Sequence, residues 1–431
     1  MATAPRSFLP VAAHSHFPLA NLPYGVFRPR FAQEPRKWAA EGSRVGCAIG
    51  DYVLDLAALE AEGAFGSTAV YGVDGCFSQG SLNAFMSLGR AVWREVRKVI
   101  TDLLSEDNPQ LRDNAELRER VLIPMSAVEM LMPAKIGDYT DFFVSKYHAE
   151  NCGAIFRGKK AVSPNWPHMP VGYHGRASSV VVSGTDIHRP RGQRMGPEGA
   201  PVQGACQKMD FELEMACLMG PGNELGSSIP VDDAEQHIFG LVLMNDWSAR
   251  DVQAWEAQPL GPFNGKNFAT TISPWVVTLD ALEPFRCPAI EQDPPVLPYL
   301  RQASPSSYDI SLQASIKDRE GDDACVVTQS NYRHLYFSLP QLVAHHTFGG
   351  CNLQPGDLLG TGTISGPTED SLGCMLELSQ NGARPLSIGR GNERTFLEDG
   401  DTVTFSGYCQ GDGFRVGFGE CSGMVLPALG S

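Results

Sequence analysis

A chain of 431 residues is long enough for more than one domain and for a sizeable hydrophobic core. Its 34 basic and 49 acidic residues give a formal net charge of −15, which argues against nucleic acid and anionic membranes as partners. The 45 glycines and 31 prolines indicate many turns and therefore a β-rich protein. An anionic substrate would need a local basic pocket in such a chain.

The 11 cysteines are scattered, odd in number and include no C-x-x-C pair. This pattern predicts free thiols in a reducing compartment, not a disulfide framework or a zinc site. No apolar run is long enough to span a bilayer, and the first residues lack the basic start and apolar core of a signal peptide. A cytoplasmic protein is therefore expected.

The first part of the chain predicts a hairpin followed by one long helix. Residues 45–56 have the pattern of two strands with a turn at Gly50-Asp51. From 82 to 103 the apolar residues recur at helical spacing, and Ser81 is a suitable N-cap.

The next segment predicts a division of the chain into two domains. Pro124 and Pro133 bracket a stretch with the character of an interdomain linker. We therefore expect a boundary near residue 120, between an N-terminal domain of residues 1–120 and a C-terminal domain of residues 121–431.

Short strands dominate the predicted C-terminal domain, with few helices. The strand candidates are residues 178–183, 239–244, 275–277, 308–312 and 402–405. One short helix is expected at 340–346, with Ser338 as its N-cap and Gly349-Gly350 as its end.

Residues 210–216 predict a strand with an acidic face. Glu212 and Glu214 alternate with apolar residues, so both carboxylates would point to one side of the strand. Neighbouring carboxylates repel, and we therefore expect a cation between them. A solvated acidic strand on the protein surface is the alternative.

Two more acidic residues could join this pair. Asp246 follows the apolar strand 239–244, and Asp141 lies in a segment rich in aromatic residues. Four carboxylates would suit Mg²⁺, Mn²⁺ or Ca²⁺, because these hard ions prefer oxygen ligands. The sequence leaves open whether the four side chains meet.

His148 is a candidate general base. It follows Asp141 by seven residues, so both would share one face if the segment were helical. Histidine is the usual base near neutral pH. A hydrogen-bonded structural histidine is the alternative.

Three cations could bind an anionic substrate or an oxyanion: Arg157, Arg250 and Lys266. Gln253 lies one helical turn after Arg250. Each of these could equally be a surface residue. The glycine-containing loop 360–366 has neither the lysine of a P-loop nor the spacing of a dinucleotide fingerprint, which excludes nucleotide binding there. The chain has no G-x-S-x-G elbow, which argues against a serine hydrolase.

Ordered motifs along most of the chain resemble the fumarylacetoacetase family. They include residues 15–18, 137–142, 170–179, 212–216, 244–251, 271–275 and 411–419. The resemblance implies hydrolysis of a carbon–carbon bond in a β-diketone, fumarylacetoacetate, as the last step of tyrosine and phenylalanine degradation. It also implies a mainly β protein with an SH3-like N-terminal barrel and a C-terminal mixed β-sandwich roll, assembled as a homodimer.

The resemblance further implies a role for individual residues. A divalent ion, Ca²⁺ or Mg²⁺, would be held by Asp141, Glu212, Glu214 and Asp246, with Lys266 and Thr270 around a second Mg²⁺ site. The catalytic group would be His148, Glu377, Arg250, Gln253 and Lys266. The substrate contacts would be Phe143, Arg157, Tyr173, Gln253, Ala257 and Thr363.

Two of these positions depart from the animal enzymes of the family. Phe143 and Ala257 each stand where those enzymes carry a tyrosine, so two hydroxyl donors are lost. A buried polar partner left unpaired costs roughly 1–3 kcal/mol, unless water, Tyr147 or Gln258 replaces the donor. The departures keep two alternatives open: acylpyruvate hydrolysis or oxaloacetate decarboxylation within the same superfamily. A non-catalytic, metal-stabilised binding protein is a third alternative.

Overall fold

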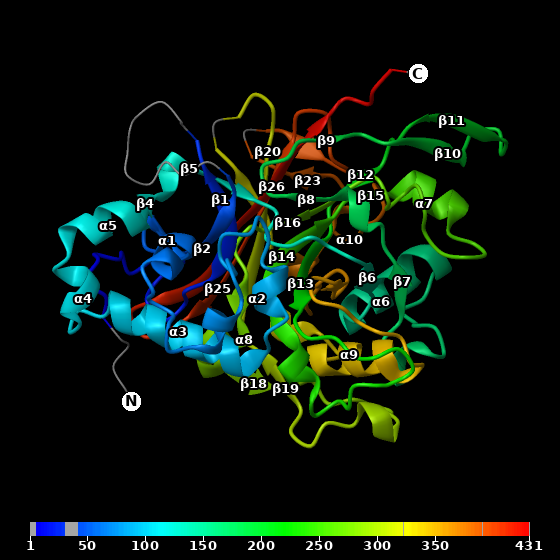
Figure 1. The fold of residues 1–431 in the computed structure, drawn as a ribbon. Helices are drawn as coiled ribbons and strands as arrows, with labels where there is room; N and C mark the ends of the chain where they lie inside the picture. The colour runs from blue at the N-terminus through cyan, green and yellow to red at the C-terminus, as the bar shows by residue number, and fades with distance from the viewer. Residues whose placement is uncertain (1–5, 31–41, 322, 390, 431) are drawn as a thin grey trace.

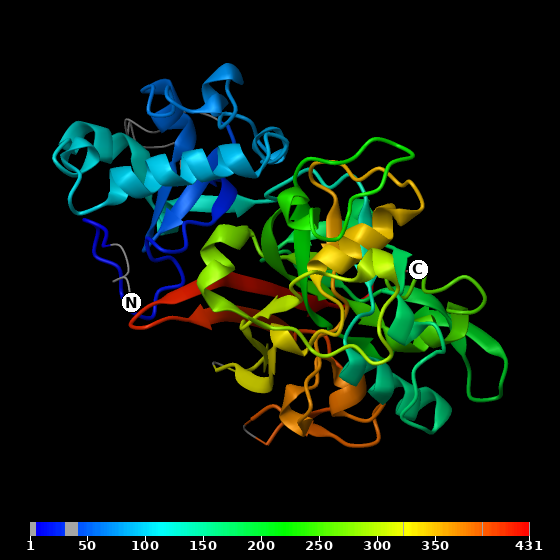
Figure 2. The same cartoon turned by 90° about the horizontal axis from the view of Figure 1, so that it is seen from below.

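The computed structural model describes residues 6–30, 42–321, 323–389 and 391–430. The chain forms a mainly β structure in which a smaller N-terminal lobe, blue to cyan, lies beside a larger C-terminal body (Figures 1 and 2). Among the described residues, none of the helices has the length and apolar character needed to cross a membrane. All eleven cysteines are free thiols, as predicted.

The N-terminal lobe is built on an antiparallel sheet in the order β4-β3-β2-β1-β5. Its strands are β1 (Tyr24–Pro29), β2 (Arg44–Ile49), β3 (Tyr52–Asp55), β4 (Leu122–Pro124) and β5 (Val128–Leu131). The predicted hairpin is confirmed, since β2 pairs with β3 across a turn in which Gly50 has a φ of 53°. Positive φ suits glycine, which has no Cβ to clash.

The predicted linker is wrong, because β4 ends at Pro124 and the segment between the two prolines supplies β5 of the same sheet. Ile123 and Val128 are buried and pack with Phe27 of β1. Burial of these apolar side chains outweighs the turn signal of the prolines. The strands of the lobe thus continue to Leu131, beyond the expected boundary at residue 120.

The long predicted helix is two helices, α2 (Asn83–Met86) and α3 (Arg90–Leu104). Gly89, with a φ of 85°, separates them and is the N-cap of α3, so Ser81 does not start one continuous helix. The buried face of α3 follows the predicted spacing at Trp93, Val96 and Ile100. The other helices of the lobe are α1 (Leu56–Ala61), α4 (Pro109–Arg112) and α5 (Ala115–Val121).

Two large sheets form the C-terminal body. The first has the order β7-β6-β22-β13-β14-β16-β8, with β17 also paired to β14. It consists of β6 (Tyr139–Phe142), β7 (Gly172–His174), β8 (Val180–Val182), β13 (Leu213–Met219), β14 (Ile238–Asp246), β16 (Thr270–Ile272), β17 (Val277–Thr278) and β22 (Leu358–Gly360). The second, in the order β21-β20-β25-β26-β9, consists of β9 (Ile187–His188), β20 (Ser311–Lys317), β21 (Cys325–Asn331), β25 (Thr402–Gln410) and β26 (Arg415–Leu426).

Shorter elements connect the two sheets and cover their ends. The remaining strands are β10 (Arg191–Met195), β11 (Pro201–Ala205), β12 (Met209–Asp210), β15 (Ser248–Ala249), β18 (Arg286–Pro288), β19 (Ser306–Tyr308), β23 (Leu386–Ser387) and β24 (Glu393–Arg394). The helices are α6 (Lys146–Arg157), α7 (Arg250–Glu256), α8 (Leu279–Leu282), α9 (Leu339–Phe348) and α10 (Met375–Leu378). The predicted cap of α9 is confirmed, with a capping box between Ser338 and Gln341.

Three predicted strands are confirmed as β8, β14 and β25, although their ends differ by several residues. Two others match less well. Residues 308–312 include the end of β19 and the start of β20, and residues 275–277 overlap β17 only at Val277.

The strand β14 is buried on both of its faces. Leu241 and Leu243 belong to the core shared with the second sheet, which includes Phe405. Phe239, Val242 and Met244 of the same strand belong to the core shared with the N-terminal lobe. This double burial explains the uninterrupted apolar run of β14 and holds Asp246, its last residue, inside the protein.

The core between lobe and body can be tested at Phe239, whose ring meets that of Trp93 edge-on at 5.0 Å between centroids. Phe239→Ala should lower the free energy of unfolding by about 3–5 kcal/mol, through lost burial and an internal cavity. Denaturant unfolding measures this. Tyr71→Ala, at a side chain that is 76% exposed, is the control and should change the value by less than about 0.5 kcal/mol. Equal effects of the two substitutions would contradict the packing described.

Candidate functional site: a buried carboxylate cluster joined to a histidine–glutamate pair

The four acidic residues singled out in the sequence meet at one place. Asp141 lies in β6, Glu214 in β13, Asp246 at the end of β14, and Glu212 just before β13. One carboxylate oxygen from each lies within 4.8 Å of the others. The alternation predicted for Glu212 and Glu214 is therefore confirmed, although residues 210–216 form two strands interrupted at 211–212.

The cluster is buried, so the alternative of a solvated acidic strand is wrong. The four residues are between 0% and 5% exposed. Both carboxylate oxygens of Glu214 and Oδ1 of Asp141 are buried and have no hydrogen-bond partner in the described part of the chain. Burial and the neighbouring carboxylates raise the pKa of Glu214 and of Asp141 well above their usual values. Unpaired buried carboxylates are costly, so this cluster is a candidate site for a cation.

A cation of the chain lies beside Glu212 and Asp246, not between Glu212 and Glu214 as predicted. The Lys266 ammonium donates to Glu212 and, at 2.8 Å, to Oδ2 of Asp246. Arg250 adds a second buried cation, with Nη1 2.8 Å from Oε1 of Glu212. Burial alone would raise the pKa of Glu212, but Lys266 and Arg250 outweigh it and hold that pKa below its usual value. Glu212 is thus compensated, whereas Glu214 is not.

A glycine allows the backbone to approach the cluster closely. Gly360 of β22 is the register partner of Asp141. A Cβ at this position would lie 2.7 Å from Oδ1 of Asp141 and 3.4 Å from Oε2 of Glu214. Only a residue without a side chain leaves that space to the carboxylates.

His148 lies beside Glu377 in the second part of the site. Its Nδ1 is 2.7 Å from Oε2 of Glu377, and both side chains are buried. Glu377 also accepts hydrogen bonds from Asn151 at 2.8 Å and from the Ser365 hydroxyl at 2.7 Å. These donors fix the carboxylate, which in turn orients the imidazole. An oriented histidine–carboxylate pair is the arrangement of a general base.

The charges of the pair depend on each other. Burial alone would raise the pKa of Glu377, but His148 and the hydrogen bonds hold it at about 2. Burial alone would lower the pKa of His148, but the neighbouring Cys152 thiol and the Glu377 carboxylate raise it well above its usual value. Glu377 is therefore ionised and makes His148 a stronger base.

The segment from Asp141 to His148 is not one helix, so the condition for a shared helical face is not met. Asp141 is in strand β6, and His148 is in helix α6, which begins at Lys146. Ser145 caps this helix, its hydroxyl accepting from the His148 amide. The two residues therefore belong to different parts of the site, and the seven-residue spacing has no helical meaning here.

Asp210 connects the two parts and was missed in the sequence. Its Oδ2 accepts from Arg250 Nε at 2.8 Å, and its two oxygens accept from the amides of Met375 and Leu376 in α10, the helix of Glu377. It lies two residues before Glu212, in the same predicted strand, but alternation alone gave it no role. Ser365 and Asn151 were missed as well, because only the fold brings them to Glu377.

Three predicted substrate-contacting residues and Thr270 lie in the site. Tyr173 and Thr270 donate hydrogen bonds to Asp246, at 2.8 Å and 3.0 Å. Gln253 accepts from Nη1 of Arg250 at 3.2 Å, one turn along α7 as expected. The hydroxyl of Thr363 is buried and has no partner among the described residues.

The other three residues predicted to contact the substrate are more exposed to solvent. The ring of Phe143 is half-buried and meets His148 edge-on, 5.2 Å between centroids. Ala257 is the half-buried C-cap of α7. Arg157, at the end of α6, is exposed; it donates to the backbone carbonyl of Ala161 and forms no salt bridge with a carboxylate among the described residues. Its contact with a substrate remains a prediction.

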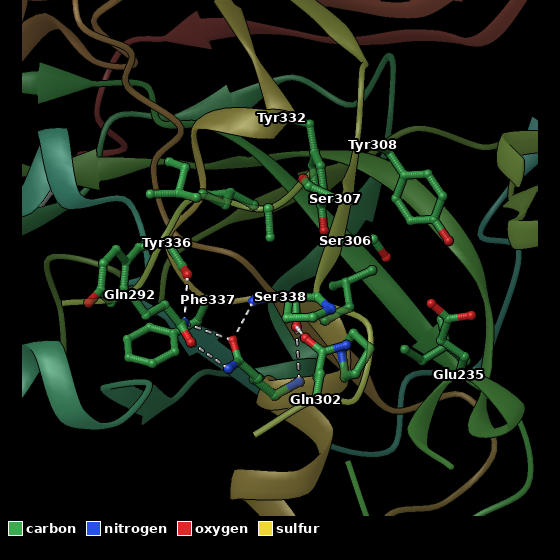
Figure 3. Close-up of a pocket in the computed structure, with 18 of the residues that line it drawn as sticks. Glu235, Gln292, Gln302, Ser306, Ser307, Tyr308, Tyr332, Tyr336, Phe337 and Ser338 are labelled. Carbon is green, nitrogen blue, oxygen red and sulfur yellow. Dashed lines mark hydrogen bonds between the residues drawn. The ribbon is translucent and has the colours of Figure 1, made fainter. Parts of the chain in front are cut away.

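A cavity of about 430 Å³ opens onto the carboxylate cluster. Tyr173, Asp246 and Lys266 line it, together with Phe263 and Arg176. Its size suits a small organic ligand. A different cavity, lined by Gln292, Gln302 and Ser338 (Figure 3), measures only about 30 Å³ and has room for one or two water molecules, so it is no substrate site.

Known proteins match this chain over nearly its whole length. The model of the fumarylacetoacetase N-terminal domain matches residues 20–133, and that of the fumarylacetoacetate hydrolase C-terminal domain matches residues 139–425. The chain is 57% identical to a fumarylacetoacetase of Arabidopsis thaliana and 52% identical to that of Homo sapiens, each over 98% of this chain and 99% of the relative. A fumarylacetoacetate hydrolase of Exiguobacterium antarcticum shares the fold, with a TM-score of 0.52 at 16% identity over 94% of this chain and 99% of that one.

The unpaired carboxylate of Glu214 can be tested by substitution. Glu214→Gln should stabilise the metal-free protein by roughly 1–3 kcal/mol, because it replaces a carboxyl group whose ionisation burial and its acidic neighbours disfavour with a neutral amide. It should also weaken the stabilisation that added Mg²⁺ or Ca²⁺ provides. Thermal unfolding with and without the ion measures both effects. Glu369→Gln, in an exposed ion pair, is the control. A Glu214→Gln protein that is less stable without metal would contradict the account.

Proposed function

Because the chain belongs to the fumarylacetoacetase family, we propose that it hydrolyses the carbon–carbon bond of fumarylacetoacetate, releasing fumarate and acetoacetate. The observation that carries this proposal is the connection of the oriented His148–Glu377 pair to a buried carboxylate cluster through Arg250 and Asp210. A structural scaffold has no need of such a buried set of charges. The reaction would be the last step of tyrosine and phenylalanine degradation.

His148 is the proposed general base. Because Glu377 accepts the Nδ1 proton, the lone pair is on Nε2 and can take a proton from water. The hydroxide attacks the carbonyl carbon on the fumaroyl side. The carbon–carbon bond then breaks, and the acetoacetate half leaves as an enolate that recovers the proton held by His148. Water is thereby divided between the two products.

Arg250, Gln253 and Lys266 are proposed to stabilise the negative charge that develops on the attacked carbonyl oxygen. The best support is Nη2 of Arg250, which is buried and has no partner among the described residues, although the other guanidinium nitrogens are held. A fixed donor in a dry site stabilises an oxyanion without the cost of reorganisation. Lys266 is also the positive charge beside Asp246 in the cavity.

The carboxylate cluster is proposed to hold Ca²⁺ or Mg²⁺. Three buried oxygens without hydrogen-bond partners, on Asp141 and Glu214, fit an ion that prefers oxygen ligands. When bound, the ion would supply a Lewis acid for the substrate carbonyl groups. A second Mg²⁺ site around Lys266 and Thr270 remains a prediction, and the Lys266 ammonium itself cannot be a ligand.

The substrate is proposed to contact Arg157, Tyr173, Gln253 and Thr363. The free hydroxyl of Thr363 and the position of Tyr173 in the cavity support this assignment. Arg157 would have to turn away from the Ala161 carbonyl to bind a substrate carboxylate. Phe143 and Ala257 would offer contacts without a hydroxyl.

Several properties implied by the family resemblance are proposed for the whole molecule. The N-terminal sheet would correspond to an SH3-like barrel and the two C-terminal sheets to a mixed β-sandwich roll. A two-domain division would then follow β5, after Leu131, and not residue 120. We also propose a cytoplasmic homodimer.

A second candidate function is acylpyruvate hydrolysis or oxaloacetate decarboxylation. The observation that favours it is Phe143, whose ring lies against His148 and has no hydroxyl to donate. A pocket without that donor suits a smaller or less polar substrate.

The two candidates are separated by following the diketone absorbance of fumarylacetoacetate and of acetylpyruvate, with Mg²⁺ or Ca²⁺ and then with a chelator. We expect fumarylacetoacetate to be turned over with the higher kcat/KM, and turnover to stop when the ion is removed. His148→Ala should abolish turnover while metal content persists. Preference for acetylpyruvate would favour the second candidate, and no turnover of either substrate would reject both.

The pH dependence tests the His148–Glu377 pair. The neutral imidazole is the active form, so kcat/KM should rise with pH through the pKa of His148, which lies above its usual value. Glu377→Gln removes the charge that raises this pKa. The acidic limb should then move to lower pH, and the plateau should fall by roughly 100-fold or more as orientation is lost. Glu150→Gln, which lies on the same helix as His148, is the control. An unmoved limb in Glu377→Gln would contradict the assignment.

A further inference from the structure

Asp210 is a fully buried carboxylate that accepts three hydrogen bonds from two separate elements. The amide of Met375 donates to Oδ1 at 2.7 Å, and the amide of Leu376 donates to Oδ2 at 2.9 Å. Nε of Arg250 donates to Oδ2 at 2.8 Å. A single side chain therefore touches both the start of α10 and the guanidinium at the start of α7.

Backbone hydrogen bonds also join the strand of Asp210 to the segment that leads into Arg250. Asp210 is the register partner of Ser248 in the β12–β15 pair, and the Lys208 carbonyl accepts from the Arg250 amide at 2.9 Å. The main chain and the Asp210 side chain thus hold Arg250 at two points. Asp210 holds Nε, and Glu212 and Gln253 hold Nη1, so Nη2 is the guanidinium donor that has no partner among the residues that the structure describes.

On the other side, Asp210 supplies the cap that α10 lacks. The N-cap residue of this helix, Cys374, makes no side-chain cap hydrogen bond, and the helix is only four residues long. The first amides of a helix have no partner within it, so an outside carboxylate satisfies them. Glu377 directly follows the two amides that Asp210 binds. A shift of this short helix would move Glu377 away from His148.

We propose that Asp210 is a positioning residue that sets the oxyanion-binding guanidinium of Arg250 and the His148–Glu377 pair in a fixed relation to each other. The inference deepens the proposed function and rests on it. A purely structural role is the competing explanation, because removing one partner of any buried ion pair destabilises a protein. The test must therefore separate lost stability from lost positioning.

The chain contains a matched control in the N-terminal lobe. Asp55 is also a buried carboxylate that accepts from an arginine Nε, that of Arg44 at 2.6 Å. It also accepts from a helix-start amide, that of Ala58 at 3.1 Å. Asp55→Asn thus disrupts the same kind of pair outside the site. If both variants lose stability but only Asp210→Asn loses rate, the difference reports on positioning.

The experiment compares wild type, Asp210→Asn, Asp55→Asn, Arg250→Gln and the Asp210→Asn/Arg250→Gln double variant, all as full-length metal-loaded enzymes. Thermal unfolding, bound metal, and kcat and KM for fumarylacetoacetate are measured on each. We expect kcat of Asp210→Asn to fall roughly 100-fold or more, with KM changed only a few-fold, because a transition-state donor is misplaced. Asp55→Asn should keep kcat within about two-fold. In the Arg250→Gln background, Asp210→Asn should cost much less than in wild type.

A second readout does not depend on turnover. Histidine NMR follows the titration of His148, identified by its absence in a His148→Asn protein. Asp210→Asn should shift this titration to lower pH, because Glu377 is no longer held in place, whereas Asp55→Asn should not. A folded Asp210→Asn protein with near-normal kcat, or an effect that multiplies fully with that of Arg250→Gln, would overturn the proposal. If wild type turns over neither diketone, the proposed function fails, and an unmoved His148 titration would then reject the positioning role as well.

Discussion

The repulsion among four carboxylates buried within 4.8 Å of one another is the constraint on which the rest of this site depends. Such a cluster persists in a folded protein only if positive charge or bound protons compensate it. Lys266 and Arg250 do so for Glu212 and Asp246, and they leave Glu214 and part of Asp141 unpaired. The incomplete compensation differs from a closed ion-pair network, and it supports the proposal that the cluster holds a cation.

The fold keeps this arrangement rigid. Three of the four carboxylates come from strands of one sheet or from its strand ends, and β14 is packed on both faces, by the second sheet and by the N-terminal lobe. The lobe therefore contributes to the site without supplying a residue to it. The His148–Glu377 pair comes from two helices, α6 and α10. The Ser145 hydroxyl donates to the Ser365 carbonyl, the Ser365 hydroxyl donates to Glu377, and Asp210 accepts from the start of α10. Charges that must act together are thus held by separate elements with few ways to move.

The sequence predicts this site better than it predicts the elements that carry it. Alternation placed Glu212 and Glu214 on one face, and the apolar run of β14 placed Asp246 at a buried strand end. The seven-residue spacing of Asp141 and His148 was misleading, because a strand–helix boundary lies between them. Local patterns cannot show contacts such as that of Asp210 with Met375, which joins residues 165 positions apart. Likewise, the strands β4 and β5 depend on tertiary packing that outweighs the local turn signal of the prolines.

The most direct test of this account relates rate to metal occupancy. Metal-free protein is titrated with Mg²⁺ or Ca²⁺, and the bound ion and the initial rate with fumarylacetoacetate are measured on the same samples. The account predicts that rate rises in proportion to occupancy, and that Asp141→Asn lowers both together. Full activity in samples without a bound ion would contradict it, since the carboxylate cluster would then have no part in the reaction.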